Sequence, residues 1–464
     1  MSTQRPSTTG FRTAAAVLAL CAVATFQLPA QETTAEATLR ARASEFAREV
    51  VRVTPDVYTA VGYSPANVSM IVGDDGVIII DTAMSPAHAA EIVKAFREIT
   101  ALPVKGIIYT HGHGDHTGGT AAFVDGAMPE IWARDNLGAE DRPLLAAGLT
   151  IQQQRGVRQA GFALPDDLRI NNGIAPPMRP GRADAFGTAV SRAADQARVE
   201  TSPNHTFSRE RQTITIAGRT LELVQSPGET DDQLYVWYPA AGVLFAGDNY
   251  YKSFPNLYAI RGTPYRDVLA WANSLDKMIN EQPRAVVPGH TRPVLGPTAA
   301  VGALTRLRDA IAFVHDKTVE GMNKGLTPDA LVQYVQLPPE LARDPDLGEY
   351  YGRVDWAVRS IFTGYLGWYD GNPTQLSPLS PTEEARRLAA LAGGQDKLLA
   401  QARQALAAGD TQWAAQLADH LLALNSDDQT VRLLKADALT VLARDSVNAL
   451  ARNYYLTVAA QLRQ

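Results

Sequence analysis

Three imidazoles and a carboxylate within six residues are the feature that most constrains this chain. The 464 residues contain only eight histidines, yet three of them fall in the run His111-Gly112-His113-Gly114-Asp115-His116. Imidazole and carboxylate are the ligands that a borderline divalent ion such as zinc prefers. The apolar run 104–110 precedes them and predicts a short buried strand. The ligands therefore begin where a strand ends, which is the usual edge for a site in an open α/β sheet.

The spacing of the motif favours two metal ions over one. His111 and His113 are two residues apart and point to the same side of an extended chain. Asp115 and His116 are adjacent and require a bend, so each pair would hold its own ion. A tetrahedral ion that keeps one position open for water needs three protein ligands. Each pair therefore lacks a ligand, which must come from further along the chain.

The first thirty residues have the pattern of an export signal. Arg5 and Arg12 give a positive start, residues 14–26 are apolar but too short for a membrane helix, and Ala30 ends a plausible cleavage site. The single cysteine, Cys21, falls in this segment, so the mature chain would have no thiol ligand. We expect a periplasmic or secreted protein with no integral membrane segment after signal removal.

The composition is that of an ordinary globular protein. Hydrophobic residues make up 45% of the chain, charged residues make up 20%, and the formal net charge is −6. No block of lysine or arginine occurs, so the sequence argues against a nucleic-acid partner.

Periodicity predicts a layered α/β domain followed by helices. Strands are expected at 57–63, 68–72, 77–81 and 104–110, with a helix over 85–99 that is capped by Ser85. Residues 136–205 are less regular and predict a long surface segment, and strands resume at 212–216, 221–224, 234–237, 243–245 and 283–288. From residue 395 onwards, alanine and leucine recur at helical spacing. They predict two repeat-type hairpins, packed on the catalytic domain or on a second subunit.

Three residues further along the chain can complete a site for two ions. Glu229 lies in a turn after the strand at 221–224, Asp248 follows the strand at 243–245, and His290 follows the strand near 285–287. Each of them stands at a strand end, as His111 does. All of these groups can therefore converge on one edge of the fold.

These residues together resemble the metallo-β-lactamase superfamily, and within it the alkylsulfatase branch. The resemblance to the superfamily rests on residues 110–116, 227–229, 247–248 and 289–290. The resemblance to the branch rests on Glu229, where most members use histidine, and on the segments 254–262, 365–373 and 452–459. It runs from Val57 to Arg463, and the branch's C-terminal lipid-carrier-like domain has no counterpart in the sequence.

The resemblance implies a metallo-β-lactamase αββα sandwich, of class α/β, followed by an all-α C-terminal dimerisation domain. The domains expected are a signal peptide over 1–30, a catalytic domain over 31–300 and a helical domain with repeat-like hairpins over 301–464. A homodimer is implied as well.

The resemblance also implies two Zn²⁺ ions per chain. His111, His113 and Glu229 would hold one ion, Asp115, His116 and His290 would hold the other, and Asp248 would bridge them. Asp115 and Asp248 are the predicted catalytic residues, and Asn256 with Arg261 would bind the sulfate group. The implied reaction is hydrolysis of an alkyl sulfate to an alcohol and sulfate by metal-bound hydroxide. The sequence leaves open whether attack falls on sulfur or on carbon.

Two departures from the branch keep other functions open. Trp356 stands where the branch usually carries a histidine that assists at the sulfate group, and Asp248 stands where the branch tends to use glutamate. Either Tyr351 or Arg353 compensates, or the substrate is another ester, a lactone or a β-lactam. A non-enzymatic protein that retains metal for stability is a third hypothesis. Aromatic residues near 350–369 would line an alkyl pocket or pack between the domains.

Overall fold

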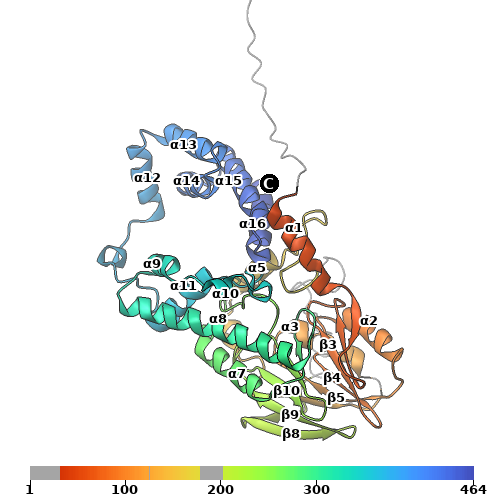
Figure 1. Cartoon of the computed structure of the whole chain (residues 1–464). Helices are drawn as coiled ribbons and strands as arrows, with labels where there is room; N and C mark the ends of the chain where they lie inside the picture. The colour runs from red at the N-terminus through yellow and green to blue at the C-terminus, as the bar shows by residue number, and fades with distance from the viewer. Residues whose placement is uncertain (1–31, 125, 178–201) are drawn as a thin grey trace, which may run out of the picture. The chain divides into compact units, whose positions relative to one another are not determined.

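The computed structural model describes residues 32–124, 126–177 and 202–464. Contacts divide the chain into Met1–Glu32 and Thr33–Gln464, and the second of these units is described below (Figure 1). The predicted export signal over residues 1–30 lies outside the described residues, as do residues 178–201 of the irregular segment. Within the described ranges, no helix combines the length and the hydropathy needed to cross a membrane.

The described residues form two mixed sheets. The first sheet has its strands in sequence order, antiparallel from β1 to β4 and parallel from β4 to β7. Its strands are β1 (Glu49–Arg52), β2 (Val57–Val61), β3 (Val68–Val72), β4 (Val77–Ile80), β5 (Val104–Ile108), β6 (Glu130–Arg134) and β7 (His205–Phe207).

The second sheet has the order β13-β12-β11-β10-β9-β8 and is antiparallel except where β11 pairs with β12. Its strands are β8 (Arg211–Ile216), β9 (Arg219–Gln225), β10 (Leu234–Tyr238), β11 (Val243–Gly247), β12 (Ala285–Pro288) and β13 (Val294–Leu295). Strands β9, β11 and β12 therefore run in the same direction and end at the same edge.

The strands of both sheets are apolar on both faces. Their inner faces meet to form the central core, and their outer faces are covered by helices. In β4, Ile78 and Ile80 point into the core between the sheets, whereas Val77 and Ile79 face the opposite side. Strand β10 behaves in the same way: Leu234 and Val236 join the central core, and Tyr235 packs on the outer face. Continuous apolar runs in the sequence thus mark strands that are covered on both sides.

Helices cover the outer face of each sheet. Helix α2 (Pro86–Arg97) packs Ile92 and Phe96 against the first sheet, and α7 (Val268–Asn280) with α8 (Pro297–Asn323) covers the second. The layers are helix, sheet, sheet and helix, which confirms the predicted αββα sandwich (Figure 1). The Ser85 side chain accepts the His88 backbone N–H, as its predicted role of helix cap requires.

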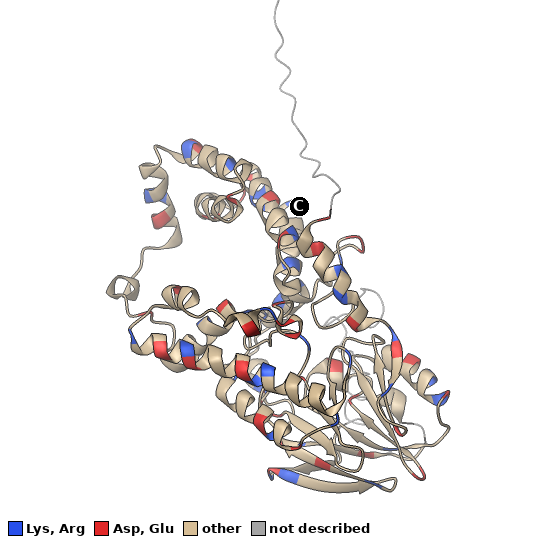
Figure 2. Cartoon of the chain, in the orientation of Figure 1, with Lys and Arg blue, Asp and Glu red and all other residues tan. Residues whose placement is uncertain are grey.

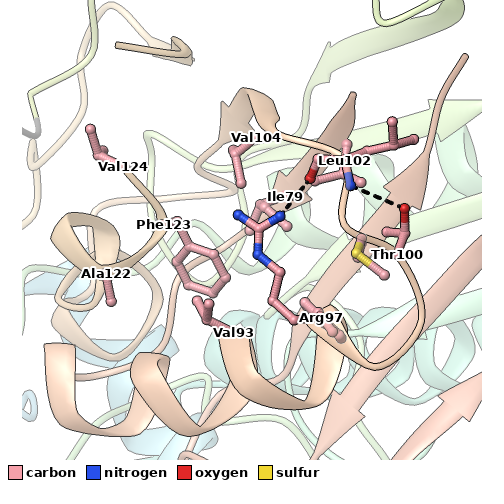
Figure 3. Close-up of a pocket in the computed structure, with 12 residues that line it drawn as sticks. Ile79, Val93, Arg97, Thr100, Leu102, Val104, Ala122, Phe123 and Val124 are labelled. Atoms are coloured by element: carbon pink, nitrogen blue, oxygen red, sulfur yellow. Dashed lines mark hydrogen bonds between the residues drawn. The ribbon is translucent and has the colours of Figure 1, made fainter. Parts of the chain in front are cut away.

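A cavity of about 220 Å³ opens between α2 and the first sheet (Figure 3). Its walls are mostly apolar and include Ile79, Val93 and Phe123. The guanidinium group of Arg97 at this cavity donates to the backbone carbonyls of Ala101 and Leu102 at 2.9 and 3.0 Å. None of the predicted ligands lines this cavity, so it is separate from the candidate site.

The remaining helices surround the sandwich or extend from it. Those within the first 300 residues are α1 (Thr34–Ala41), α3 (Gly114–Thr117), α4 (Arg142–Ala146) and α5 (Ile151–Ala160), with the 3₁₀ turns η1 (Arg42–Phe46) and η2 (Thr120–Phe123). After α8 come α9 (Pro328–Tyr334), α10 (Pro339–Ala342), η3 (Pro345–Leu347), α11 (Val354–Leu366), η4 (Pro373–Leu376) and α12 (Pro381–Leu391).

The last four helices form the two predicted hairpins. They are α13 (Gln395–Ala407), α14 (Thr411–Leu424), α15 (Gln429–Arg444) and α16 (Ala449–Leu462). Helices α12 to α15 share an apolar cluster that includes Ala389, Leu398, Leu417 and Val431. Each hairpin thereby buries the alanine and leucine faces that give the sequence its periodicity.

Helix α16 joins the hairpins to the rest of the chain. Asn453 donates to the backbone carbonyl of Gln159 at the end of α5, and Arg452 donates to the carbonyl of Leu168 at 2.6 Å. Leu456 packs with Leu164. The hairpins are therefore packed on the segment that connects β6 to β7 of the first sheet, which is one of the two arrangements predicted.

Figure 2 shows acidic and basic residues interspersed over the described part of the chain. Many of them form surface pairs, such as Lys317 with Glu320 and Arg463 with Asp437.

Asn448 supplies a testable link between the hairpins and residues 349–352. Its buried amide donates to the backbone carbonyls of Glu349 and Tyr351 at 2.9 Å each, and its Oδ1 caps α16 by accepting the Ala451 N–H. We expect Asn448→Ala to lower the free energy of unfolding by about 2–4 kcal/mol, because a cap is lost and buried carbonyls are left unpaired. Urea unfolding measures this loss.

The matched control is Ser380→Ala, which removes an exposed cap from α12 that accepts only the Glu383 N–H. That variant should lose about 1 kcal/mol. Equal losses in the two variants would show that the bonds from Asn448 to residues 349–352 contribute nothing to stability.

Candidate metal centre

The predicted ligands come together because their strands end at one edge. Strand β5 leads into His111 and His113, and the short helix α3 after it carries Asp115 and His116. Strand β11 leads into Asp248, and β12 leads into the turn that ends at His290. The turn after α3 is tight: a Cβ atom on Gly119 would collide with the backbone oxygen of Thr82.

Six of the seven predicted ligands form two groups. His111, His113 and Asp248 make one group, and Asp115, His116 and His290 make the other, with the ligand atoms of each group within 4.8 Å of one another. Asp248 contacts both groups. Its Oδ2 lies 3.7 Å from His111 Nε2 and 3.2 Å from His290 Nε2, and its Oδ1 lies 3.3 Å from His116 Nε2. Asp248 thus lies between the two groups and within 3.7 Å of an imidazole from each.

Glu229 lies beside these groups without belonging to either. Its Oε1 accepts from Arg266 Nη1 at 2.8 Å, and its backbone N–H donates to Asn249. Its Oε2 is buried and has no hydrogen-bond partner within the described residues. Burial raises the pKa of Glu229 and the charge of Asp248 adds to this, while Arg266 and His113 oppose it. The role of Glu229 as a ligand stays a prediction.

Three of the imidazoles are oriented by an oxygen atom on their outer side. His116 Nδ1 lies 2.7 Å from Asp81 Oδ2, His290 Nδ1 lies 2.8 Å from the carbonyl of Pro65, and His111 Nδ1 lies 3.1 Å from Thr110 Oγ1. The Asp81 carboxylate and the Pro65 carbonyl accept the Nδ1 protons of His116 and His290, and all three rings turn Nε2 toward Asp248 at the centre. In metal sites, an oxygen atom that holds the outer nitrogen of an imidazole in this way fixes the orientation of the ring.

The charges of the centre act strongly on the imidazoles. Burial lowers the pKa of His111 well below its usual value, and the neighbouring imidazoles lower it further. Burial also opposes protonation of His116, but the carboxylates of Asp248, Asp81 and Asp115 outweigh it and raise its pKa well above the usual value. These three carboxylates thus give His116 a strongly negative environment.

The centre suits a cation because several of its buried polar atoms have no other partner. Among the described residues, His116 Nε2, Asp248 Oδ1 and Glu229 Oε2 are buried without a hydrogen bond. Such atoms are costly in a protein interior unless something binds them. All are ligand atoms of imidazole or carboxylate, so the donor set fits a divalent metal ion.

The two predicted substrate residues lie at the same edge. Arg261 Nη2 is 3.2 Å from His113 Nε2 and 3.2 Å from Glu140 Oε1. Asn256 is fully buried, and neither its amide nitrogen nor its amide oxygen has a hydrogen-bond partner within the described ranges. The backbone N–H of Asn256 donates to the Tyr251 hydroxyl at 2.8 Å. The guanidinium group of Arg261 and the unpaired side-chain amide of Asn256 are therefore the polar groups next to the predicted ligands.

Tyr351 and Arg353, the two candidates to take the role of the histidine that Trp356 replaces, differ in position. Arg353 is engaged with Asp355 through two 2.8 Å bonds and lies over the Trp356 ring. Tyr351 packs edge-on against Tyr251, whose ring in turn faces His290. Burial raises the pKa of Tyr351, and the charge of Glu229 adds to the effect, so its hydroxyl keeps its proton at neutral pH. Tyr351 is therefore the better placed of the two.

The aromatic residues near 350–369 do not act as one cluster. Tyr351 is beside the centre, whereas Tyr365 and Trp368 are 49% and 72% exposed. The last two residues therefore neither line an enclosed pocket nor pack in the core.

Three charged residues of the centre are absent from the sequence prediction. Asp81 follows β4 and receives bonds from His116 Nδ1 and the Thr110 backbone, so its place at a strand end was an available signal. Arg266 and Glu140 lie in loops with no motif around them. Their contacts bring together residues that are 37 and 121 positions apart in the chain, which no local pattern reveals.

Comparisons with known proteins agree with this geometry. The model of the "Metallo-beta-lactamase superfamily" matches residues 61–290, and the model "Alkyl sulfatase dimerisation" matches residues 327–464. A linear primary-alkylsulfatase from Pseudomonas sp. (strain ATCC 19151) is 38% identical over 404 residues, which cover 85% of this chain and 73% of that protein. An (R)-specific secondary-alkylsulfatase from Pseudomonas sp. is 32% identical over 89% of this chain.

A solved structure shows the same fold. The structure of a stereoselective inverting sec-alkylsulfatase from Pseudomonas sp. matches with a TM-score of 0.81 and 30% identity, over 90% of this chain and 66% of that one. The chain spans 62% of the length of the secondary-alkylsulfatase named above.

Fold and site together define an enzyme of the metallo-β-lactamase type with an added helical domain. Within that class the chain belongs to the alkylsulfatase family, since it is 38% identical to a linear primary-alkylsulfatase over 85% of its length and its helical region matches the alkyl sulfatase dimerisation model. The predicted family and enzyme class are thus confirmed.

The buried Arg266 gives a prediction on the electrostatics of the centre. It is paired with Glu229 and lies 3.5 Å from Glu140 Oε1. We expect Arg266→Met to lower the free energy of unfolding by about 3–5 kcal/mol in chelator-treated protein, because the buried Glu229 loses the cation paired with it. The folded-state pKa of Glu229, which burial already raises, should rise further above that of the unfolded chain. The loss should therefore grow as pH rises from 5.5 to 8.

Urea unfolding at the two pH values measures the effect. The control is Arg463→Met, whose ion pair with Asp437 is exposed and should be worth at most about 1 kcal/mol. A loss in Arg266→Met that does not change with pH would contradict the electrostatic explanation.

Proposed function

We propose that this protein hydrolyses alkyl sulfate esters to an alcohol and inorganic sulfate. The observation that carries the proposal is the pairing of a cation-type centre with Arg261 and the unpaired amide of Asn256 at one buried edge. The relatives named above are alkylsulfatases, which supports the same substrate class.

The centre is proposed to hold two Zn²⁺ ions. His111, His113 and Glu229 would hold one ion, Asp115, His116 and His290 would hold the other, and Asp248 would bridge them. The support is the pair of ligand groups and the uncommitted buried atoms of Asp248 and Glu229. Bound ions of this kind supply activated water at neutral pH and stabilise charge on a substrate oxygen.

Arg261 and Asn256 are proposed to bind the sulfate group. A sulfate ester carries one negative charge on tetrahedral oxygens, and a guanidinium group offers parallel donors that match two such oxygens. The Asn256 amide would donate one more hydrogen bond and gain the partner it lacks among the described residues. The ester would thereby be fixed beside the ligands, which favours attack in one orientation.

Asp115, Asp248 and Tyr351 are proposed to assist the reaction. The Asp115 side chain is 21% exposed, against 5% for Asp248, so it is the carboxylate that can orient an incoming water molecule. Asp248 would instead hold the two halves of the centre together. Tyr351 keeps its proton at neutral pH and lies beside the centre, so it can donate a hydrogen bond to the ester in place of the histidine that Trp356 replaces.

The proposal predicts that sulfate is released from primary or secondary alkyl sulfates. His113→Ala should abolish release. Arg261→Lys and Asn256→Ala should lower kcat/KM by about 10- to 100-fold, because each removes a hydrogen bond to a charged group. Ion chromatography of released sulfate, with dodecyl sulfate and 2-octyl sulfate as substrates, measures these effects.

Arg463→Lys, which alters an arginine on the helical hairpins, is the control and should match the wild type. A lactone and a β-lactam belong in the same assay because Trp356 replaces the expected histidine. If the protein hydrolyses the lactone or the β-lactam but releases no sulfate, and if His113→Ala abolishes that hydrolysis, then the protein is a lactone or β-lactam hydrolase and the alkyl sulfate proposal is wrong.

We also propose that the protein forms a homodimer through its helical region. Several large apolar side chains between α11 and α13 are exposed: Leu366 is 57% exposed, Leu376 59%, Trp368 72% and Leu391 87%. They lie within residues 327–464, the part that matches the dimerisation model. Apolar side chains gathered at this density on one segment are typical of a protein interface.

The dimer proposal predicts that Trp368→Lys combined with Leu391→Lys converts the dimer to a monomer. A buried charge at each position should oppose association. Light scattering after size exclusion measures the mass. Leu145→Lys, at a residue 73% exposed on α4, is the matched control and should leave the dimer intact. A wild-type protein that is monomeric at all concentrations would contradict the proposal.

The export signal over residues 1–30 remains a proposal, and with it a periplasmic or secreted location. Its support is the charge and hydropathy pattern of those residues.

A further inference from the structure

Glu140 is a buried carboxylate of the centre to which neither the family resemblance nor the reaction gives a role. It lies in the loop between β6 and α4, and its side chain is 8% exposed. Its Oε2 is 3.6 Å from His113 Nε2, and its Oε1 is 3.2 Å from Arg261 Nη2 and 3.5 Å from Arg266 Nη2. The loop thus brings a negative charge against an imidazole and two guanidinium groups.

His113 differs from the other three imidazoles in its orientation. His111, His116 and His290 each place Nδ1 against a protein oxygen and turn Nε2 toward the centre. In His113 it is Nδ1 that faces the centre, 2.8 Å from His111 Nε2. The outward nitrogen of His113 is therefore Nε2, and the groups beside it are Arg261 and Glu140.

These two neighbours favour opposite tautomers of His113. A guanidinium group has only donors, so contact with Arg261 favours a His113 without a proton on Nε2. The proton would then be on Nδ1, facing the centre, where it excludes a cation. A carboxylate only accepts, so Glu140 favours the proton on Nε2 and leaves the Nδ1 lone pair available.

We propose that Glu140 is a positioning residue that fixes His113 in the tautomer able to bind a cation through Nδ1. This inference rests on the proposed function, because the tautomer matters only where a metal ion binds. Glu140 Oε2 is buried and has no hydrogen-bond partner in the described part of the chain, so no other donor competes for it. A movement of a few tenths of an ångström would complete its hydrogen bond with His113.

Glu140 also balances charge around the same imidazole. Arg261 and Arg266 both lie within 3.5 Å of its Oε1, and each would otherwise repel a cation at His113. The carboxylate thus allows a sulfate-binding arginine and a metal-binding imidazole to share one buried space. This pairing of a carboxylate with a liganding histidine follows a general pattern in metal sites.

Zinc affinity of purified protein tests the inference. Competition with a chromophoric chelator measures the two binding steps in wild type, Glu140→Ala and Glu140→Gln. We expect Glu140→Ala to weaken one of the two zinc equivalents by about 10- to 100-fold and to leave the other within a factor of about two. Glu140→Gln keeps an acceptor oxygen but loses the negative charge, so it should recover part of that affinity.

A spectroscopic readout separates positioning from a loss of structure. The visible absorption of the Co²⁺-substituted protein should change for one ion in Glu140→Ala and not in Asp141→Asn, the matched control. Asp141→Asn removes the same charge from the same loop, and no contact joins Asp141 to His113 among the described interactions. Circular dichroism confirms that each variant is folded.

The outcomes distinguish this inference from the proposed function. If wild type binds two zinc ions and Glu140→Ala binds both with unchanged affinity and spectrum, the positioning role is wrong and the metal centre stands. An equal loss in Asp141→Asn would also overturn it, because the effect would then be one of loop charge alone. A wild type that binds no zinc would overturn the proposed function as well.

Discussion

The burial of many ionisable groups at one sheet edge is the constraint on which the rest of this structure depends. Imidazoles and carboxylates are costly away from water unless each is paired or bound. Here the carboxylates of Asp81, Asp248 and Glu229 are each set against an imidazole or a guanidinium group. The αββα sandwich makes this possible, because rigid strands from both sheets end at the same edge and hold the groups close together.

The helical region contributes to the centre as well as extending from it. Asn448 at the start of α16 binds the backbone of residues 349–352, and the Gly352 N–H donates to the carbonyl of Phe254, two residues before Asn256. A Cβ atom on Gly352 would collide with the Pro255 backbone. The segment that carries Tyr351 thus lies between the hairpins and the proposed sulfate-binding loop. Hydrogen bonds join it to both of them.

Specificity in this fold depends on the residues around a shared hydrolytic centre. The donor set fits divalent metal ions, and a metal centre of this kind suits many esters. Arg261, Asn256 and Tyr351 add the features that suit a tetrahedral monoanion. Tyr351 carries a hydroxyl close to these charges, and burial raises its pKa further above neutral, so it stays protonated.

The sequence by itself determined the layered fold, most strand and helix positions, and the residues 111–116, 248 and 290 as one centre. These features are local, since periodicity, strand ends and ligand spacing are all visible along the chain. Only the tertiary structure decided that Arg266 pairs with Glu229, that Asp81 orients His116, and that Glu140 meets His113. Those contacts join loops that are distant in sequence, and their strength comes from burial and charge, which no short motif encodes.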